Sequence, residues 1–511
     1  MKNRNQIIYV FLVLGLIIAG FVIRIYDLQD APLDFHPTRQ LHSALMARGI
    51  YYSLNPNLNI PDWQRQTAIR QWQLEGLVEP PLMEWLVAFT YQLAGGVYLW
   101  IARLYAILFW MVAAFGILLI VREMAGNAGS LAALALFLFF PYAIYASRSF
   151  QPETLLVAGL VFTFWAAMQW EKKKTWRWAL AAGLLGGLSI LIKAVAIFFV
   201  AGIWLGLLLS RMKLSAILKN RQLWLIGFLC LLPYTIFMGY ANFIVGGYEG
   251  QFSLRFFPQL WTQIGFYLRW VGTLRLAIGL EWLTLGLLGV LLVKEKQQRW
   301  MLIGAWVGYG LLGFTLSYHI STHDYYNLPA YLMVCLGVGV LFQKLFLLNT
   351  NSKWFSHLTI ILLLFVITIY GYEAYSTLKR TNYSQEIAFW QEMGINLGHS
   401  AHVVALSEDY GYRLAYWGWV SPINWMNTED IRLRRESGQT YDFEQYFKSQ
   451  VQDKDYFLVT LLNELEKQPE LKQQLFLIVR IVRIFRFLEN SRLSNKRTGQ
   501  IYVLFAKRLN L

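Results

Sequence analysis

Long apolar runs recur along the chain and predict its architecture. Eleven of them are close to 20 residues and carry almost no charge, which is the length that an α-helix needs to cross the hydrocarbon core of a bilayer. The pattern predicts a mainly α, polytopic bundle of about eleven transmembrane helices. The runs lie at residues 6–25, 100–121, 129–147, 152–170, 177–192, 194–210, 222–242, 272–293, 300–318, 327–347 and 355–375.

The first run follows the basic segment "MKNRNQ" and could be a signal peptide. It has no small-residue cleavage site and continues into "RIYDLQD". These features favour an uncleaved signal anchor.

Lysine and arginine are unevenly shared between the gaps that separate the runs. Alternate gaps hold clusters such as "KKKTWR", whereas the short gaps between them hold one basic residue or none. Because cytoplasmic loops are enriched in Lys and Arg, this asymmetry predicts a cytoplasmic N-terminus. Eleven spans then place the first long loop, residues 26–99, and the segment after residue 375 on the outer face.

Residues 376–511 have a different pattern from the rest of the chain. Short β-like runs, "HVVALS", "YFLVT" and "IYVLFA", alternate with helical stretches such as "SQEIAFWQEMGINL". The alternation predicts a small extramembrane α/β domain that follows a transmembrane domain of residues 1–375.

Composition agrees with an integral membrane protein. The chain is 57% hydrophobic, has a mean hydropathy of +0.40 and is only 15% charged, which excludes an ordinary soluble enzyme. The net charge of +15 suits loops held against anionic lipid better than binding to nucleic acid. Cys230 and Cys335 both lie in apolar runs and imply no disulfide framework.

The remaining ionisable groups of the membrane region gather on one predicted side. Ionisable groups at membrane depth are costly unless they pair, meet water or bind a ligand, so their shared side predicts one outward-facing polar site. Simpler readings stay open: an Arg148–Glu153 ion pair, a snorkelling Lys193, and His323 as a helix cap. The groups are Asp34, His36, His42, Glu79, Arg148, Glu153, Lys193, His319, His323 and Asp324.

Two segments of the outer loops complete the candidate site. In "DFHPTRQLHSALMARGIYY", Pro37 or Thr38 is expected to begin an amphipathic helix that lies on the outer leaflet and holds Asp34 over the bundle. In "NIPDWQRQTAIRQWQLEG", the aromatic and amide side chains suit either sugar rings or an interfacial belt.

At this point the sequence resembles a known family. The segment "EPPL", the arginine and "QPE" that open the fourth run, the lysine after the fifth run and "HDYYNLP" are similar to motifs of the C-type (GT-C) membrane glycosyltransferases. The resemblance covers roughly residues 6–375. The nearest comparison is the family of protein O-mannosyltransferases and the lipid A aminoarabinose transferase, glycosyltransferase family 39-like.

The resemblance implies a function. Such enzymes move a sugar from a polyprenyl-phosphate donor to an acceptor on the outer face, with inversion; the acceptor could be a glycan, a lipid or a protein. A divalent metal ion is the one cofactor that the resemblance leaves open. The departing phosphate needs positive charge and the acceptor needs a carboxylate base.

The resemblance also suggests a role for each candidate. Asp34 is the expected base and Glu153 the second catalytic acid. The donor phosphate would be bound by Arg148, Lys193 and Arg255, and Glu79 and His323 would hold a metal or position the donor. The family shows an adjacent Asp-Glu pair where this chain has "HPTR", so Asp34, His36 or another acid replaces it. Further site candidates are His36, Arg39, His42, Asp324 and Tyr325.

Three other functions compete with this reading. A transporter would show repeated halves with interrupted helices, and no repeat is evident in the sequence. A scaffold protein would not need carboxylates at the membrane mouth. A lipid-linked glycan ligase or flippase would use similar chemistry or the same lipid. Short loops and the lack of a retention motif predict the plasma (inner) membrane of a prokaryote.

Overall fold

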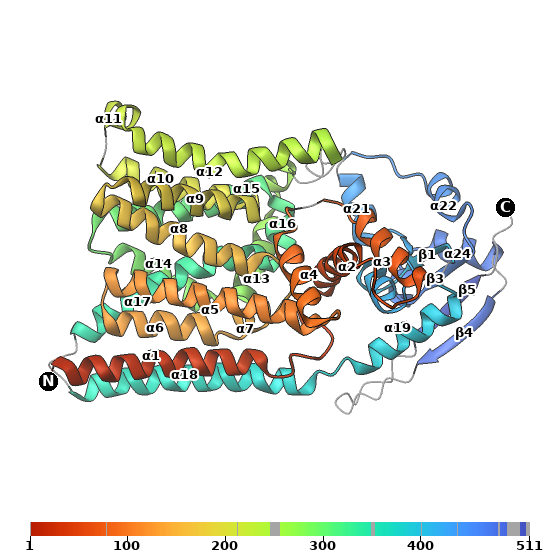
Figure 1. Ribbon diagram of the computed structural model, residues 1–511, viewed down its shortest axis with the longest axis horizontal. Coiled ribbons are helices and arrows are strands. Elements are labelled where there is room, and N and C mark those ends of the chain that lie inside the picture. The colour runs from red at the N-terminus through yellow and green to blue at the C-terminus, as the bar shows by residue number, and fades with distance from the viewer. Residues whose placement is uncertain are drawn as a thin grey trace. The chain divides into compact units, whose positions relative to one another are not determined.

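The chain forms two compact units in a computed structural model (Figure 1). The structure describes residues 2–77, 79–211, 213–245, 256–348, 353–399, 401–436, 438–478, 481–487 and 501–506. The first unit comprises Met1–Gln29, Leu77–Met83 and Trp100–Thr381. The second comprises Asp30–Gly76, Glu84–Leu99 and Asn382–Leu511. Most of the first long loop therefore groups with the C-terminal segment, which the sequence did not predict.

The first unit is a bundle of long apolar helices that run alongside one another (Figure 1). The unit also contains short helices that are not α-helices: η1 (Ala241–Val245), η3 (Pro258–Thr262) and η4 (Asp324–Asn327). The α-helices are α1 (Lys2–Ile25), α5 (Leu99–Met124), α6 (Asn127–Phe139), α7 (Pro141–Ala146), α8 (Glu153–Lys173), α9 (Trp176–Ile192), α10 (Ala196–Arg211), α11 (Leu214–Lys219), α12 (Arg221–Tyr240), α13 (Ile264–Ala277), α14 (Leu280–Leu291), α15 (Lys296–Thr315), α16 (Ser317–Thr322), α17 (Leu328–Leu348) and α18 (Lys353–Arg380).

The predicted apolar runs are helical in the structure, and the protein is a multi-pass membrane protein. Among the described residues, five helices are long and apolar enough to cross a membrane: Gln6–Ile25, Leu99–Met124, Glu153–Lys173, Arg221–Val245 and Asp324–Leu348. Three more apolar helices, α6, α9 and α10, are shorter. The count of eleven spans stays a prediction.

Two of the predicted runs break well inside their length. The run at 272–293 is divided between α13 and α14, which are bent by 87° at Ile278 and Gly279. Gly279 has φ 81, a left-handed conformation that glycine adopts without steric cost and that ends a helix. The run at 129–147 breaks in the same way at Phe140, just before Pro141, into α6 and α7.

Helices of the first unit approach closely at glycines. A Cβ on Gly304 of α15 would lie 2.0 Å from the carbonyl oxygen of Gly202 in α10. A Cβ on Gly289 of α14 would lie 1.8 Å from that of Gly337 in α17. Small residues let membrane helices pack backbone to backbone, because lipid gives no hydrophobic force to drive them together.

Burial varies strongly from helix to helix in this unit. In α8, 83% of the most apolar window is buried, whereas the value is 17% for α1 and 11% for α12. Exposed side chains on α1 and α12 include Phe11, Ile18, Phe228 and Ile236. Large apolar side chains facing outward are expected where the solvent is lipid.

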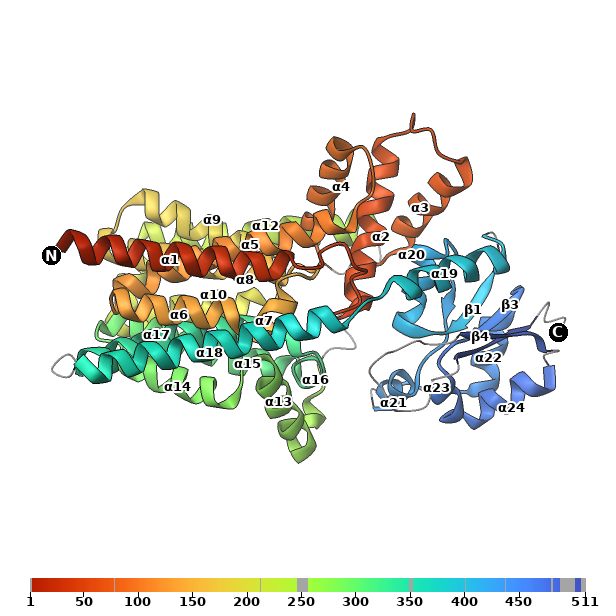
Figure 2. The ribbon, with the colours of Figure 1, turned by 90° about the horizontal axis from the view of Figure 1, so that it is seen from below.

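The second unit combines a small sheet with short helices (Figure 2). The sheet order is β2-β1-β3-β5-β4, with β2, β1 and β3 parallel and the last two strands antiparallel to their neighbours. Its strands are β1 (Val403–Leu406), β2 (Ile423–Asn424), β3 (Tyr456–Val459), β4 (Ile481–Phe487) and β5 (Ile501–Ala506). Its helices are α2 (Pro37–Leu54), α3 (Asp62–Leu74), α4 (Leu82–Ala94), α19 (Ser384–Leu397), η5 (Glu408–Gly411), α20 (Tyr412–Trp417), α21 (Thr428–Glu436), α22 (Phe443–Val451), α23 (Leu462–Glu466) and α24 (Pro469–Ile478).

The core of this unit lies against the parallel strands. Val404, Leu406, Phe457 and Val459 of β1 and β3 pack with Trp425 and with apolar residues of α22 and α24. In Figure 2, α19 and α20 lie on one side of the sheet and α22 and α24 on the other. The three predicted strand segments are strands. β4 was not predicted, because the apolar positions of "IVRIFRF" do not alternate strictly.

Helix α2 differs from the prediction in its surroundings. It begins at Pro37, as expected, but it is not an amphipathic helix with one exposed polar face. The stretch from Gln40 to Tyr51 is buried apart from His42. The close packing of α3 explains this burial, since a Cβ on Gly49 would lie 2.2 Å from the Cβ of Trp72. The expected amphipathic character of α2 is therefore wrong, and its position on the outer leaflet stays a prediction.

Candidate functional site

The turn between α7 and α8 carries the most unusual polar sequence of the first unit. Residues 147–152 form this turn. At its start the amides of Arg148 and Ser149 donate hydrogen bonds to the carbonyls of Tyr145 and Ala146 in α7. Two buried arginines fix this turn from neighbouring helices. Arg24 Nε donates to Ser147 Oγ at 2.6 Å, and Arg103 Nε donates to the Arg148 carbonyl at 3.3 Å.

Lys193 links this turn to two carboxylates. Its Nζ donates to Glu153 Oε1 at 2.5 Å and lies 3.4 Å from Glu79 Oε1. Glu153 is the first residue of α8, and Lys193 is the residue that ends α9. Both side chains are buried, and Glu79 is partly buried. The ion pair of Glu153 is thus with Lys193, and Lys193 is not a snorkelling surface lysine.

Aromatic side chains from η4 complete the environment of Lys193. Its ammonium lies 5.0 Å from the ring centre of Tyr325 and 4.6 Å from that of Tyr326, so both rings contribute cation–π attraction. Beside them, Tyr142 of α7 donates a hydrogen bond of 2.8 Å to Asp324. The structure therefore gathers Glu79, Glu153, Lys193 and Tyr325 from four separate segments.

The carboxylates keep Lys193 charged. Burial alone would lower the pKa of Lys193, because an ammonium loses its hydration. The negative charges of Glu153 and Glu79 outweigh burial, and the pKa is raised above its usual value. One cation and two carboxylates leave this cluster with a formal excess of negative charge.

Several buried polar atoms near Glu153 have no hydrogen-bond partner among the described residues. They are Oε1 and Nε2 of Gln151, Oε2 of Glu153 and Oγ1 of Thr154. The three residues are at most 2% exposed. Because nearly all buried polar atoms in proteins are paired, a cluster of exceptions is a feature expected of a binding site.

The other candidates of the first unit are placed as follows. Arg148 Nη2 donates to the Asp27 carbonyl at 3.2 Å, and Arg148 is 1% exposed. His323 Nδ1 lies 2.8 Å from Thr322 Oγ1, and its ring stacks on His319. Arg255, the third candidate for the donor phosphate, lies outside the described residues.

Asp34, His36, Arg39 and His42 belong to the second unit. Asp34 lies in the segment before α2, where Gln40 Nε2 donates to the carbonyls of Pro32 and Phe35. His36 has φ 44 and stands at the helix N-cap. His42 Nδ1 lies 2.5 Å from Glu75 Oε2. The catalytic role of Asp34 stays a prediction.

A divalent metal ion does not fit the geometry around Glu79 and Glu153. The Lys193 ammonium contacts both carboxylates and supplies the positive charge that a metal would bring. Across the described residues, no group of three or more His, Cys, Asp or Glu side chains could hold a metal.

Sequence reasoning missed several residues that build this site. Arg24 and Arg103 lie inside predicted membrane runs, and a charge at that depth is itself a signal that could have identified them. Tyr142 carries no such signal, because its importance depends on which neighbours the fold brings to it.

The helical bundle and the mixed sheet form a fold that this chain shares with C-type membrane glycosyltransferases of known structure. Residues 78–238 match the model of the family described as dolichyl-phosphate-mannose-protein mannosyltransferase. The resemblance seen in the sequence is confirmed by this match. None of the curated proteins matches the sequence.

Solved structures show the same fold. ArnT from Cupriavidus metallidurans in the apo state is similar with a TM-score of 0.58 and 13% identity, over 99% of this chain and 98% of that one. ArnT bound to undecaprenyl phosphate gives 0.55 and 14%, over 97% of each chain. The Archaeoglobus fulgidus oligosaccharyltransferase in complex with Zn and sulfate gives 0.55 and 11%, over 95% of this chain and 73% of that one.

Proposed function

We propose that the protein transfers a sugar from a polyprenyl-phosphate donor to an acceptor on the outer face of the membrane, with inversion. The observation that carries this proposal is the buried cluster of Lys193, Glu153 and Glu79. Beside it lie polar atoms of Gln151 and Thr154 that have no hydrogen-bond partner among the described residues. The family match over residues 78–238 and the undecaprenyl phosphate in one ArnT structure support the choice of donor.

The geometry of the cluster suggests a separate role in the reaction for each residue. Lys193 is already paired with two carboxylates, so its main role is to hold Glu153 and Glu79 in place. Arg148, whose guanidinium can bind a phosphate through two parallel hydrogen bonds, is the candidate for the charge that develops on the departing phosphate. Glu153 orients the acceptor, and Asp34 accepts its proton.

The proposal includes a topology. Eleven spans with a cytoplasmic N-terminus place Glu79, Arg148, Glu153, Lys193 and the C-terminal sheet on the outer side. The asymmetry of Lys and Arg between the gaps supports this arrangement. Short loops favour the plasma membrane of a prokaryote.

The decisive experiment measures donor cleavage by purified protein in nanodiscs. The protein is incubated with a panel of polyprenyl-phosphate sugars, and release of free polyprenyl phosphate is followed for wild type, Glu153→Gln and Asp34→Asn. Loss of a positioned acid or base typically costs about 10²–10⁴-fold in rate, and both variants should show a loss of this size. Asp62→Asn is the matched control, because the Asp62 side chain is 85% exposed.

The outcomes separate the alternatives. Cleavage that depends on Glu153 but not on Asp34 would keep the transferase and move the base. Chelator-resistant cleavage would agree with the lysine-bound carboxylates. Transfer of an oligosaccharide in preference to a single sugar would identify a ligase. No binding of any polyprenyl-phosphate sugar would contradict the proposal and favour a transporter or a scaffold.

A further inference from the structure

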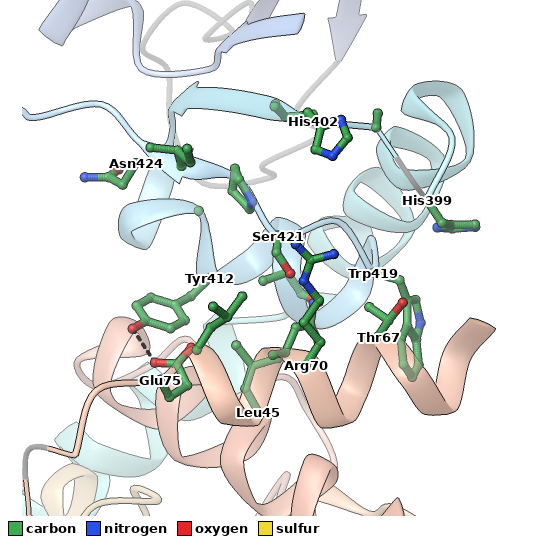
Figure 3. Close-up of a pocket in the computed structure, with 18 of the residues that line it drawn as sticks. Leu45, Thr67, Arg70, Glu75, His399, His402, Tyr412, Trp419, Ser421 and Asn424 are labelled. Carbon is green, nitrogen blue, oxygen red and sulfur yellow. Dashed lines mark hydrogen bonds between the residues drawn. The ribbon is translucent and has the colours of Figure 1, made fainter. Parts of the chain in front are cut away.

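The second unit contains a large cavity that the proposed chemistry does not use. Its volume is about 1010 Å³. One wall is α3, and the other is built by the ends of β1 and β2 and by residues that flank α20 (Figure 3). Ligand pockets usually measure about 300–1,000 Å³, so this cavity can hold a ligand of two or three sugar units.

Aromatic rings form one end of the cavity. Trp63 of α3 stacks on His399 with ring centres 4.3 Å apart and planes 14° from parallel. Trp419 meets Trp63 edge to face, with centres 6.0 Å apart. Trp63 is 39% exposed, although a tryptophan ring gains by burial. Flat, accessible aromatic faces of this kind suit the C–H faces of sugar rings.

Trp419 is held in place at a conformational cost. Its φ of 58 is left-handed, which is uncommon for a residue with a side chain. The guanidinium of Arg48 lies 3.9 Å from its ring centre. Arg48 is itself buried and donates to Gln71 Oε1 and to the carbonyls of Ala415 and Tyr416. A backbone conformation of this kind persists where surrounding contacts hold it, and such positions are common at ligand-binding sites.

The polar lining has unused hydrogen-bonding capacity and positive charge. Neither Arg70 nor Lys454 forms an ion pair with any described residue. Side chains of the lining that make no hydrogen bond within the described ranges are Gln66, Thr67, Ser421 and Asn424. The one carboxylate of the lining, Glu75, already accepts from Tyr412 at 2.9 Å (Figure 3) and contacts His42.

We propose that this cavity binds an acidic saccharide. Sugar rings stack on Trp63 and Trp419, hydroxyls bond to the amide and hydroxyl side chains, and a carboxylate or phosphate substituent pairs with Arg70 and Lys454. An acidic peptide would use the two cations but would leave the aromatic faces and the neutral polar lining unmatched. The proposal that a saccharide binds depends only on the cavity. The inference that this saccharide is the acceptor rests on the proposed function.

The test measures binding of soluble probes to the full chain in nanodiscs by calorimetry. Trigalacturonate carries carboxylates, maltotriosyl phosphate carries a phosphate, maltotriose is neutral, and a tripeptide of aspartate represents the peptide. At least one acidic saccharide should bind at least about tenfold more tightly than maltotriose, which is the size of one hydrogen bond to a charged group. The acidic saccharide that binds more tightly identifies the anionic group, carboxylate or phosphate, that the cavity recognises.

Three variants sharpen the test. Arg70→Gln should reduce the preference for the acidic saccharide, Trp419→Ala should weaken all saccharides, and Trp419→Phe should restore part of that binding. Lys448→Gln on α22, an exposed lysine outside the cavity, is the control and should bind like wild type. Unchanged thermal unfolding shows that each variant is folded.

Three results would overturn the inference: equal binding of maltotriose and both acidic saccharides, no effect of Arg70→Gln, or tighter binding of the tripeptide. Donor cleavage measured on the same wild-type preparation separates the two proposals. Cleavage without saccharide binding rejects the cavity alone, whereas saccharide binding without cleavage rejects the transferase alone.

Discussion

Two polar regions of the molecule differ in how their charged side chains are buried and paired. In the first unit, Lys193 is enclosed and paired with Glu153 and Glu79. In the second unit, Arg70 and Lys454 face a cavity and pair with no described residue. One region has removed its charges from water, and the other keeps them accessible.

The difference teaches what each region can do. Enclosed charges act strongly on a small reacting group, because little water remains to screen them. Accessible charges and aromatic faces discriminate between ligands but do little chemistry. The comparison therefore agrees with the proposed chemistry around Lys193 and with the proposed saccharide binding beside Arg70.

The largest expected effect comes from removing the enclosed cation. Lys193→Met leaves two carboxylates without their cation, and breaking a buried ion pair in this way costs about 3–5 kcal/mol. The loss of stability is measured by unfolding in mixed detergent micelles. Combining Lys193→Met with Glu153→Gln removes charges of both signs and should recover part of the stability. A single variant as stable as wild type would show that the region is hydrated rather than enclosed.

A packing variant tests whether the enclosing bundle is as tight as its backbone contacts indicate. Gly304→Ala places a methyl group 2.0 Å from the Gly202 carbonyl oxygen, and overpacking of this kind costs about 1–3 kcal/mol. Gly310→Ala on the same helix is the control, since nothing lies within 4 Å of its Cβ. Equal unfolding curves for the two variants would contradict close packing of α10 on α15.

A smaller, pH-dependent effect is expected in the second unit. Burial alone would raise the pKa of Glu464, but hydrogen bonds from Lys467 and Thr428 lower it to about 2. Because the unfolded pKa is about 4.3, the stabilising contribution is present above that pH and is lost as the pH falls toward 2. Solvent screening limits it to less than about 1 kcal/mol. Glu464→Gln should lower the thermal midpoint at pH 7 and have less effect at pH 3.

The smallest change in stability is expected from substitution of Arg70, the accessible cation. Arg70→Met removes a charge that has no partner, so stability should change by no more than about 0.5 kcal/mol. Thermal unfolding beside Lys193→Met compares the two regions directly. A large loss for Arg70→Met would mean that this charge supports the fold and is not reserved for a ligand.

The helices were the part of the fold that the sequence predicted well. Apolar runs such as 100–121 and 327–347 became α5 and α17, because hydrocarbon length and backbone hydrogen bonding leave a membrane segment few alternatives. The break at Gly279 was missed, since hydropathy does not register a change in backbone direction. The surroundings of α2 were also missed, because burial of a helix depends on partners distant in sequence.

The candidate site was predicted only in part. Glu79, Glu153 and Lys193 lie on one predicted side of the membrane, and the structure gathers them. Their pairing could not be predicted, since positive-inside arguments give the side of a loop but not its neighbours. The grouping of residues 30–76 with the C-terminal sheet could not be predicted from the sequence either. The cavity lined by Trp63 and Trp419 depends on that grouping, so it was also missed.

The glycine contacts have a mechanical consequence. Helices whose backbones touch, as α10 does α15 and α14 does α17, cannot slide past one another without separating first. Helix α12 is held in the same way, since a Cβ on Gly187 of α9 would lie 2.2 Å from the carbonyl oxygen of Leu229 in α12. The first unit is therefore expected to deform by movement of locked helix pairs and not by sliding of single helices.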